Sequence, residues 1–273
     1  MPVPPRTTSP VSVGARLIAV LDAFSERAAA LTLSELSRRT GLPLTSTHRL
    51  VGELVAGGLL ERGEDGRYRI GLRLWEIASL APRGVGLREN AMPFLEDLYE
   101  ATHQHVQLAV LADREVLYLE RISGRDAVSI ISRVGGRLAP HATGVGVVLL
   151  AHAPVEVQEA ILAGPLRRYT ARTETRPSEL RRILADVRRD GYAITDGTVE
   201  TVALSVAAPV RGPDDAVVAA ISVVVPAESA QPREIVPAVV AAARGISRVL
   251  GAPGSQRLGR TVRRETHRRD LRI

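Results

Sequence analysis

The chain has 273 residues, of which 45% are hydrophobic and only 3% aromatic, enough for two domains with aliphatic cores. It contains no cysteine, which excludes disulfides and thiolate metal sites. All 36 basic residues are Arg and the formal net charge is +6. Residues 257–273 alone carry seven Arg and two acidic residues, a net charge of +5, whereas residues 1–80 carry ten and eight, a net charge of +2. A nucleic-acid partner must therefore be argued from where Arg lies, not from the total charge.

The first residues indicate neither a signal peptide nor a folded element. Residues 1–11 are rich in Pro, Ser and Thr, so we expect a disordered arm there. The start has no apolar stretch of signal-peptide length, and no apolar run approaches the ~20 residues of a membrane span. We therefore expect a cytoplasmic protein with no membrane partner. Ser12 is placed to cap a helix whose apolar residues recur at helical spacing up to Phe24.

The stretch from residue 31 to residue 70 has the pattern of two short helices, a turn and a two-stranded hairpin. Thr32 and Glu35 have the spacing of a capping box at the start of the first helix. Gly41 suits the left-handed residue that ends this helix. Pro43 then suits the start of the second helix, where a missing N–H costs nothing. The pattern predicts a helix-turn-helix unit.

The second of these helices has a polar face at its N-terminal half, opposite apolar residues spaced four apart. Hydroxyls on such a face suit DNA phosphates, and Arg49 is placed to reach a phosphate or a guanine edge. Strands at 59–62 and 67–70 then flank a Gly-Glu-Asp-Gly turn and form a wing. The candidate DNA-binding residues are Arg16, Arg38, Thr45, Ser46, Thr47, His48, Arg49, Arg62, Arg67 and Arg69. Taken alone, the segment also fits a helical pair and hairpin that bind nothing.

A third helical pattern follows the wing and is broken at Pro82, so a linker helix is expected over residues 72–86. Trp75, the single Trp, is expected to be an interface or core anchor. Strand-like and helical runs beyond Leu87 indicate an α+β sheet domain. The expected strands are 106–111, 116–122, 128–132, 192–195, 202–210 and 217–225, and the expected helices are 87–102, 145–151, 155–164, 178–190 and 233–250. In the helix at 178–190, Ser178 is the expected cap and Ile183 an expected buried residue.

A Gly-rich loop leads into the helix at 145–151 and is the best candidate for a small-ligand site. Thr143 and Gly144 lie at the start of this helix, where free amides and the helix dipole favour an anion. A plain helix cap explains the same residues, so that alternative stays open. Asp196, Ser205 and Ser222 lie in or beside expected strands, where each alone is more often a structural residue than a ligand contact.

Other sequence features argue against a metal site and against an enzyme. His103 and His105 have no third ligand at a convincing spacing, so we expect no metal. Gly84-x-Gly86 lacks the third Gly and the preceding strand of a dinucleotide motif. No nucleophile elbow or phosphate loop occurs, so we expect no catalytic residue and no cofactor. The Arg-rich tail at 253–273 is expected to be disordered and solvated, with nonspecific DNA affinity as the alternative.

Three segments, taken together, resemble the IclR family of bacterial transcriptional regulators over residues 12–252. The first is LTLSELSRRTGLPLTSTHRLVGELVAGGLLER with the wing RYRIGLRLWEIA. The second is LAPHATGVGVVLLA, which is similar to the effector loop of the family. The third comprises YTARTETRP, VRRDGYAITDG, VAAPV and VVAAISVVVP. Their order along the chain is that of the family, which makes the resemblance specific.

The resemblance implies a winged helix-turn-helix at 12–71, a linker helix at 72–86, and a GAF-like effector domain at 87–252 with an antiparallel sheet flanked by helices. It implies a homodimer or homotetramer on a palindromic operator in double-stranded DNA, with repression expected rather than activation. It also implies a small carboxylate or aromatic acid as effector. By analogy with the family, the effector contacts are Thr143, Gly144, Val145, Thr195, Asp196, Ser205 and Ser222.

The chain departs from the family pattern at three positions. Members commonly have Lys where this chain has Val147, and many have Glu and Gly where it has Thr198 and Val202. Two alternatives to an effector-controlled regulator therefore stay open. One is a DNA-binding regulator whose C-terminal domain only assembles oligomers. The other is an enzyme that uses this domain, against which the missing nucleophile, base and metal motifs argue.

Overall fold

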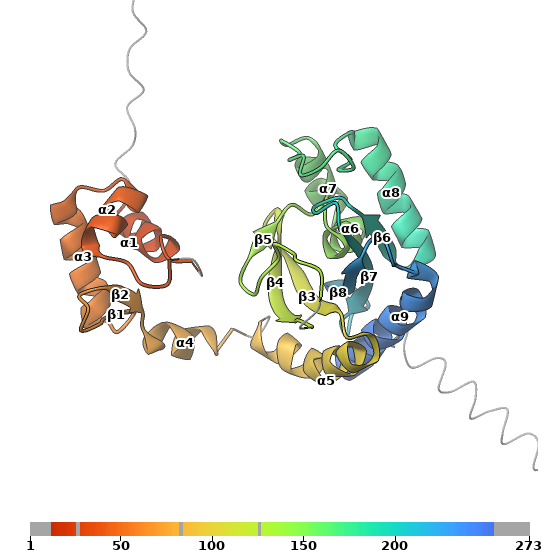
Figure 1. Cartoon of the computed structure of the whole chain (residues 1–273), viewed down its shortest axis with the longest axis horizontal. Coiled ribbons are helices and arrows are strands. Elements are labelled where there is room, and N and C mark those ends of the chain that lie inside the picture. The colour runs from red at the N-terminus through yellow and green to blue at the C-terminus, as the bar shows by residue number, and fades with distance from the viewer. Residues whose placement is uncertain (1–11, 26–27, 82–83, 125–126, 254–273) are drawn as a thin grey trace, which may run out of the picture. The chain divides into compact units, whose positions relative to one another are not determined.

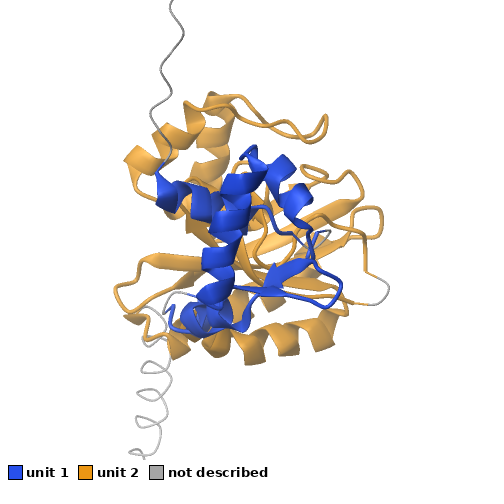
Figure 2. Ribbon diagram, turned by 90° about the vertical axis from the view of Figure 1, so that its left-hand side faces the viewer, with its two compact units in different colours: residues 1–85 blue, residues 86–273 orange. Residues whose placement is uncertain are grey.

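A computed structural model describes residues 12–25, 28–81, 84–124 and 127–253. The chain divides into two compact units, residues 1–85 and residues 86–273 (Figure 2). The expected arm at 1–11, the break at Pro82 and the tail from residue 254 lie outside the described residues. Within the described part, none of the helices combines the length and apolar character needed to cross a membrane.

The first unit is a winged helix-turn-helix, as the residue pattern predicts. Its elements are α1 (Val13–Asp22), α2 (Leu33–Thr40), α3 (Leu44–Ala56), β1 (Leu60–Arg62) and β2 (Tyr68–Ile70) (Figure 1). The capping box of α2 is present, because the Thr32 amide donates to the Glu35 carboxylate at 2.8 Å and the Glu35 amide donates to Thr32 Oγ1 at 3.3 Å. Gly41 ends α2 in the left-handed region, with φ of 69°. The structure thus confirms the predicted capping box and the predicted left-handed glycine.

The core of the first unit lies where the helices and the hairpin meet. Its fully or nearly fully buried members are Val20, Leu31, Leu36, Leu50, Val51, Leu54 and Leu60. By contrast, α4 (Leu72–Ala78) buries none of its residues within the chain. Trp75 on α4 is 69% exposed, which rules out the core anchor that was one of its two expected roles.

The second unit is built on one antiparallel sheet. Within the described residues it has six strands in the order β5-β4-β3-β8-β7-β6. The strands are β3 (His105–Ala112), β4 (Glu115–Ile122), β5 (Arg137–Leu138), β6 (Ala193–Asp196), β7 (Ala203–Arg211) and β8 (Val217–Pro226). Every neighbouring pair is antiparallel.

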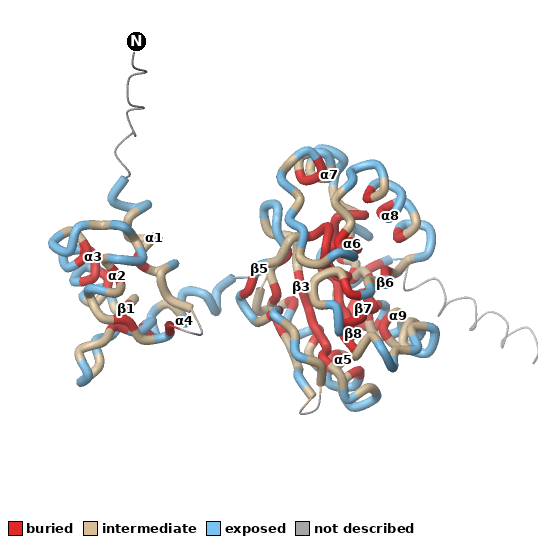
Figure 3. Tube along the Cα trace, turned by 45° about the horizontal axis from the view of Figure 1, so that its top comes forward, coloured by how far each residue is buried: buried red, intermediate tan, exposed pale blue. Residues whose placement is uncertain are grey.

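Helices cover both faces of this sheet. They are α5 (Val85–Thr102), α6 (Gly144–His152), α7 (Val155–Leu162), α8 (Pro177–Asp190) and α9 (Pro232–Val249) (Figure 1). Successive strand residues point to opposite faces, so Val206 and Ile221 pack toward α5 and α9 while Ala207 and Ala220 pack toward α6 and α8. Figure 3 shows buried residues running along β3, β7 and β8. The predicted α+β fold, with an antiparallel sheet flanked by helices, is confirmed.

Three local predictions in this unit are wrong. Residues 128–132 form a loop rather than a strand, because β5 takes the position beside β4 at the sheet edge, with Leu138 opposite Val116. Helix α8 begins at Pro177, so Ser178 lies inside its first turn and does not cap it. Ile183 is 36% exposed, because the buried stripe of α8 runs through Leu180, Leu184 and Val187.

Candidate functional site

The N-terminal half of α3 presents a polar face to solvent. Thr45, His48 and Arg49 are exposed on it. The N-cap residue, Pro43, makes no side-chain hydrogen bond to the helix, so first-turn amides are available to an anion such as a DNA phosphate. Arg49 forms an ion pair with Glu53 one turn further on, and both side chains are about half exposed. Exposed pairs of this kind contribute little to stability, so the guanidinium can exchange Glu53 for a phosphate or a base.

One candidate DNA contact on α3 is wrong. Thr47 is fully buried, and its hydroxyl donates to the Pro43 carbonyl at 3.1 Å. It belongs to the stripe with Leu50, Val51 and Leu54 that faces the core. Its hydroxyl therefore stabilises the start of the helix from inside, and it has no access to DNA.

Two Arg side chains of the wing have partners within the unit. Arg67 donates to the Ala30 carbonyl at 3.2 Å and to the Glu35 carboxylate at 3.1 Å, which fastens the hairpin to α2. Arg69 donates to both carboxylate oxygens of Asp65, at 3.1 and 2.6 Å. The side-chain hydrogen bond from Arg69, followed by the Arg67 amide, lowers the pKa of Asp65 to about 2. These contacts fix the shape of the wing, and a DNA contact by either guanidinium stays a prediction.

The remaining candidate DNA residues lie at different places on the unit. Arg62 is exposed on β1, with its guanidinium carbon 5.8 Å from the centre of the Tyr68 ring. Arg38 is exposed near the end of α2. Arg16 on α1 and Ser46 on α3 are half-buried.

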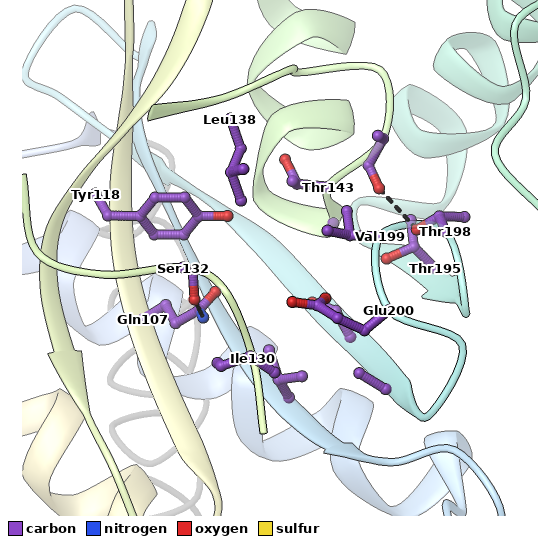
Figure 4. A pocket seen from close by; sticks show the side chains of 15 residues that line it. Gln107, Tyr118, Ile130, Ser132, Leu138, Thr143, Thr195, Thr198, Val199 and Glu200 are labelled. Carbon is purple, nitrogen blue, oxygen red and sulfur yellow. Dashed lines mark hydrogen bonds between the residues drawn. The ribbon is translucent and has the colours of Figure 1, made fainter. Parts of the chain in front are cut away.

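The second unit contains a pocket at the start of α6, with a cavity volume of about 40 Å³ (Figure 4). All six strands of the sheet contribute to its walls, together with the start of α6 and loops on either side. Its lining residues are Gln107, Tyr118, Ile130, Ser132, Leu138, Ala142, Thr143, Gly144, Thr195, Thr198, Val199, Glu200, Ala203, Ser205 and Val224. Four of the predicted effector contacts, namely Thr143, Gly144, Thr195 and Ser205, are therefore brought together.

The start of α6 lies close against β6 and β7 in this pocket. Thr143 is the N-cap, and its hydroxyl accepts the Gly146 amide at 3.1 Å. A β-carbon at Gly144 would lie 2.6 Å from Ser205 Oγ and 3.3 Å from Thr195 Oγ1. A larger residue at position 144 would therefore force Ser205 to shift, and the helix start beside it is favourable for a carboxylate.

Two hydroxyl or carboxyl groups in the pocket have perturbed ionisation. Burial raises the pKa of Tyr118, opposed by a hydrogen bond with Thr143, so the phenol is neutral near pH 7. Burial also raises the pKa of Glu200, whose carboxylate accepts the Ile131 amide at 2.5 Å. The pocket thus combines neutral hydroxyl groups, a helix N-terminus and one desolvated carboxyl group.

A buried polar chain forms the floor beside Tyr118. Gln107 Nε2 donates to Ser132 Oγ at 2.6 Å, and Gln107 Oε1 accepts the Ser222 hydroxyl at 3.1 Å. Gln107 and Ser222 are opposite one another on β3 and β8. Because both ends of the amide are engaged, the orientation of Gln107 in the pocket wall is fixed.

The sequence matches two family models that together span both units. Residues 15–64 match the IclR helix-turn-helix domain, and residues 81–248 match the C-terminal domain of the bacterial transcriptional regulator IclR. The chain belongs to the IclR family of transcriptional regulators. Its first unit is therefore a DNA-binding domain.

Curated relatives and a solved structure agree with this family. The HTH-type transcriptional regulator XynR of Escherichia coli K12 is 33% identical over 246 residues, which cover 87% of this chain and 96% of XynR. The transcriptional repressor IclR of the same organism is 29% identical over 185 residues, covering 66% of this chain and 68% of the repressor. A crystal structure of an IclR homolog complexed with 4-hydroxybenzoate, from Microbacterium hydrocarbonoxydans, is 44% identical with a TM-score of 0.84 and covers 88% of this chain and 99% of that one. The relatives are transcriptional regulators and not enzymes.

Three residues that the IclR resemblance placed at the effector do not line the pocket. The side chain of Val145 is only 1% exposed and packs in the apolar cluster around α6, because it faces into the sheet. Asp196 lies on the exposed edge strand β6 and pairs with Arg172 at 2.8 Å. Ser222 is buried behind Gln107, which it holds by a hydrogen bond.

Sequence reasoning missed most of the wall that faces α6. Gln107 and Tyr118 occupy buried positions of β3 and β4, and a polar residue inside an apolar strand was the available signal. Glu200 lies in the turn before β7 and carried no local signal. No group of three or more His, Asp or Glu side chains suited to a metal ion occurs in the part of the chain that the structure describes.

Proposed function

We propose that this IclR-family regulator is a repressor whose affinity for operator DNA is set by a small aromatic carboxylate bound at the start of α6. The observation that carries the proposal is the pocket in which Thr143, Gly144 and Ser205 meet. It supplies a helix start for a carboxylate, and Tyr118 and Leu138 for the ring. The homologue complexed with 4-hydroxybenzoate, 44% identical to this chain, supports this class of ligand.

On the DNA side, we propose that α3 enters the major groove with Thr45, His48 and Arg49 toward the DNA. The exposure of these three side chains supports this orientation. A two-fold symmetric dimer, or a dimer of dimers, would read a palindromic operator, because the symmetry of the site mirrors that of the protein. Repression follows if the bound oligomer occludes a promoter, and the repressor among the relatives supports this direction.

Effector control requires a difference in affinity. A ligand that binds the DNA-competent and DNA-incompetent states equally well shifts nothing, and a full switch needs ~5.5 kcal/mol of difference between them. The test measures operator affinity by fluorescence anisotropy at fixed salt, with and without 4-hydroxybenzoate, on the promoter beside the protein's own gene and on random duplex. We expect a preference for the promoter that the acid changes.

A variant and a matched control make the test specific to the pocket. Ser205→Leu fills the cavity beside Gly144, and Ser229→Leu places the same side chain in an exposed turn. Ser205→Leu should remove the response to the acid, and Ser229→Leu should retain it. An equal response in both variants would refute the pocket, and equal affinity for promoter and random duplex would refute the regulator function.

A second candidate is a regulator whose C-terminal domain binds no effector and serves only in assembly. The small cavity favours it, because about 40 Å³ is far below the ~300–1,000 Å³ of typical small-molecule sites. A rise in melting temperature with any aromatic acid, lost in Ser205→Leu, would exclude this candidate.

A further inference from the structure

The one formally charged side chain among the described residues of the pocket wall is acidic, whereas a simple organic acid would be expected to meet a basic one. That side chain belongs to Glu200. A carboxylate ligand therefore meets no Arg in the pocket wall and does meet another carboxyl group. Because like charges repel, we expect the ligand carboxylate and the Glu200 carboxyl group to lie at different ends of the site.

The geometry supplies those two ends. Figure 4 shows Thr143 and Glu200 on different sides of the space toward which Tyr118 points. Thr143 marks the start of α6, where amides favour the ligand carboxylate. The ligand atom on the other side then faces Glu200.

The carboxylate of Glu200 has one hydrogen-bond donor and room for another. One carboxylate oxygen accepts the Ile131 amide at 2.5 Å, and within the described residues no donor is bonded to the other. A desolvated carboxylate with spare acceptor capacity binds a hydroxyl or amino group well, since a charged acceptor makes the stronger type of hydrogen bond. Burial is the main cause of the raised pKa of Glu200, because desolvation disfavours the charged carboxylate.

We propose that Glu200 is a specificity residue that accepts a hydrogen bond from the far end of the effector. The effector class is then an aromatic acid with a hydroxyl or amino group opposite its carboxylate, and not an unsubstituted aromatic acid. This inference rests on the proposed function, because it assigns the second end of the same pocket.

The experiment compares ligands that differ in one donor. Isothermal titration calorimetry of the full chain uses 4-hydroxybenzoate, 4-fluorobenzoate and benzoate; fluorine is close to hydroxyl in size and donates no hydrogen bond. The wild-type protein should bind 4-hydroxybenzoate about tenfold or more tightly than either of the others, as expected for a hydrogen bond to a charged group. Glu200→Ala should reduce this ratio to less than about threefold.

Two further variants separate charge from folding. Glu200→Gln keeps an acceptor without the charge, so its ratio should lie between those of the wild-type protein and Glu200→Ala. Glu228→Gln, in an exposed turn of the same unit, should keep the wild-type ratio. Melting curves of each variant establish that it is folded at the temperature of the titration.

The outcomes separate this inference from the function on which it rests. If the wild-type protein binds all three acids with equal affinity, or if Glu200→Ala keeps the full preference, the role of Glu200 is overturned and the pocket stands. If the wild-type protein binds none of the acids, the proposed effector function falls and this inference falls with it.

Discussion

A β-carbon on Gly144 would stand 2.6 Å from the Oγ of Ser205, so the first residue of α6 and the third of β7 approach one another as closely as glycine allows. The same approach brings the start of α6, Thr195 and Ser205 to one pocket. Packing and the proposed ligand binding therefore both depend on the absence of a side chain at position 144.

Gly144→Ala should weaken both folding and effector binding. The added methyl group collides with Ser205, and overpacking of this kind costs about 1–3 kcal/mol. Gly86→Ala on α5 is the control, because no atom lies within 4 Å of the place its methyl group would take, and it should be neutral or stabilising by up to about 1 kcal/mol. Thermal melting and calorimetry with 4-hydroxybenzoate measure the two effects. Equal melting temperatures for Gly144→Ala and the wild-type protein would contradict the close approach.

Arg49→Ala should weaken operator binding by about 1–3 kcal/mol and relax the sequence preference, if Arg49 reads a base from the exposed face of α3. Its release from Glu53 costs little, because both side chains are already about half exposed. Gel-shift titration at fixed salt measures the change. Arg244→Ala removes an exposed guanidinium from α9 of the other unit and should bind normally. Unchanged binding by Arg49→Ala would remove Arg49 from the interface.

Thr47→Val should lower stability and leave DNA preference intact. The substitution keeps the buried shape but loses the hydrogen bond to the Pro43 carbonyl, a loss of about 0.5–1.5 kcal/mol. Melting of the variant, together with operator competition by mutated duplexes below the melting temperature, provides the measurement. An altered base preference in a fully folded variant would place Thr47 at the DNA and contradict its burial.

The contribution of Glu200 to stability should fall as the pH rises above the unfolded pKa of its carboxyl group. Burial raises the pKa of Glu200 from 4.5, so between 4.5 and the folded value the native protein holds a proton that the unfolded chain has lost. The native state is then favoured at the acidic side of this window and loses that advantage as the pH passes the folded pKa. Melting curves across the window should show that the wild-type protein loses stability relative to Glu200→Gln as the pH rises. Parallel curves for the two proteins would argue against a buried carboxyl group.

Local signals made the first unit predictable. The capping box of Thr32 and Glu35 and the left-handed Gly41 depend only on residues within a few positions of each other, so the sequence pattern reveals them. The same period of 3.6 residues, followed strictly, places Thr47 in register with Leu50 and Val51 and therefore inside. The hydroxyl of Thr47 can donate to a DNA phosphate as well as to a backbone carbonyl. The residue type therefore suggested a DNA contact, whereas the helical register places the side chain in the core.

Long-range pairing decided what the sequence could not reveal. Residues 128–132 have strand-like composition, but Leu138 takes the place opposite Val116. Which segment pairs with a strand depends on the other segments available, so the sequence of one segment does not reveal it. Glu200 reaches the pocket only because its turn lies across from Ile131, which is 69 positions away in the chain. The family resemblance located the α6 side of the pocket, because its loop motif covers Thr143 and Gly144. It missed the wall formed by β3 and β4, because no family motif covers those two strands.

The small cavity at the start of α6 also has a kinetic consequence. A volume of about 40 Å³ is far below that of typical small-molecule sites, so a benzene ring fits only once the surrounding segments have separated. Association should then reach a plateau rate at high ligand concentration that equals the rate of this separation. The rate of the response to the proposed effector would then be set by the opening of the pocket rather than by diffusion of the ligand.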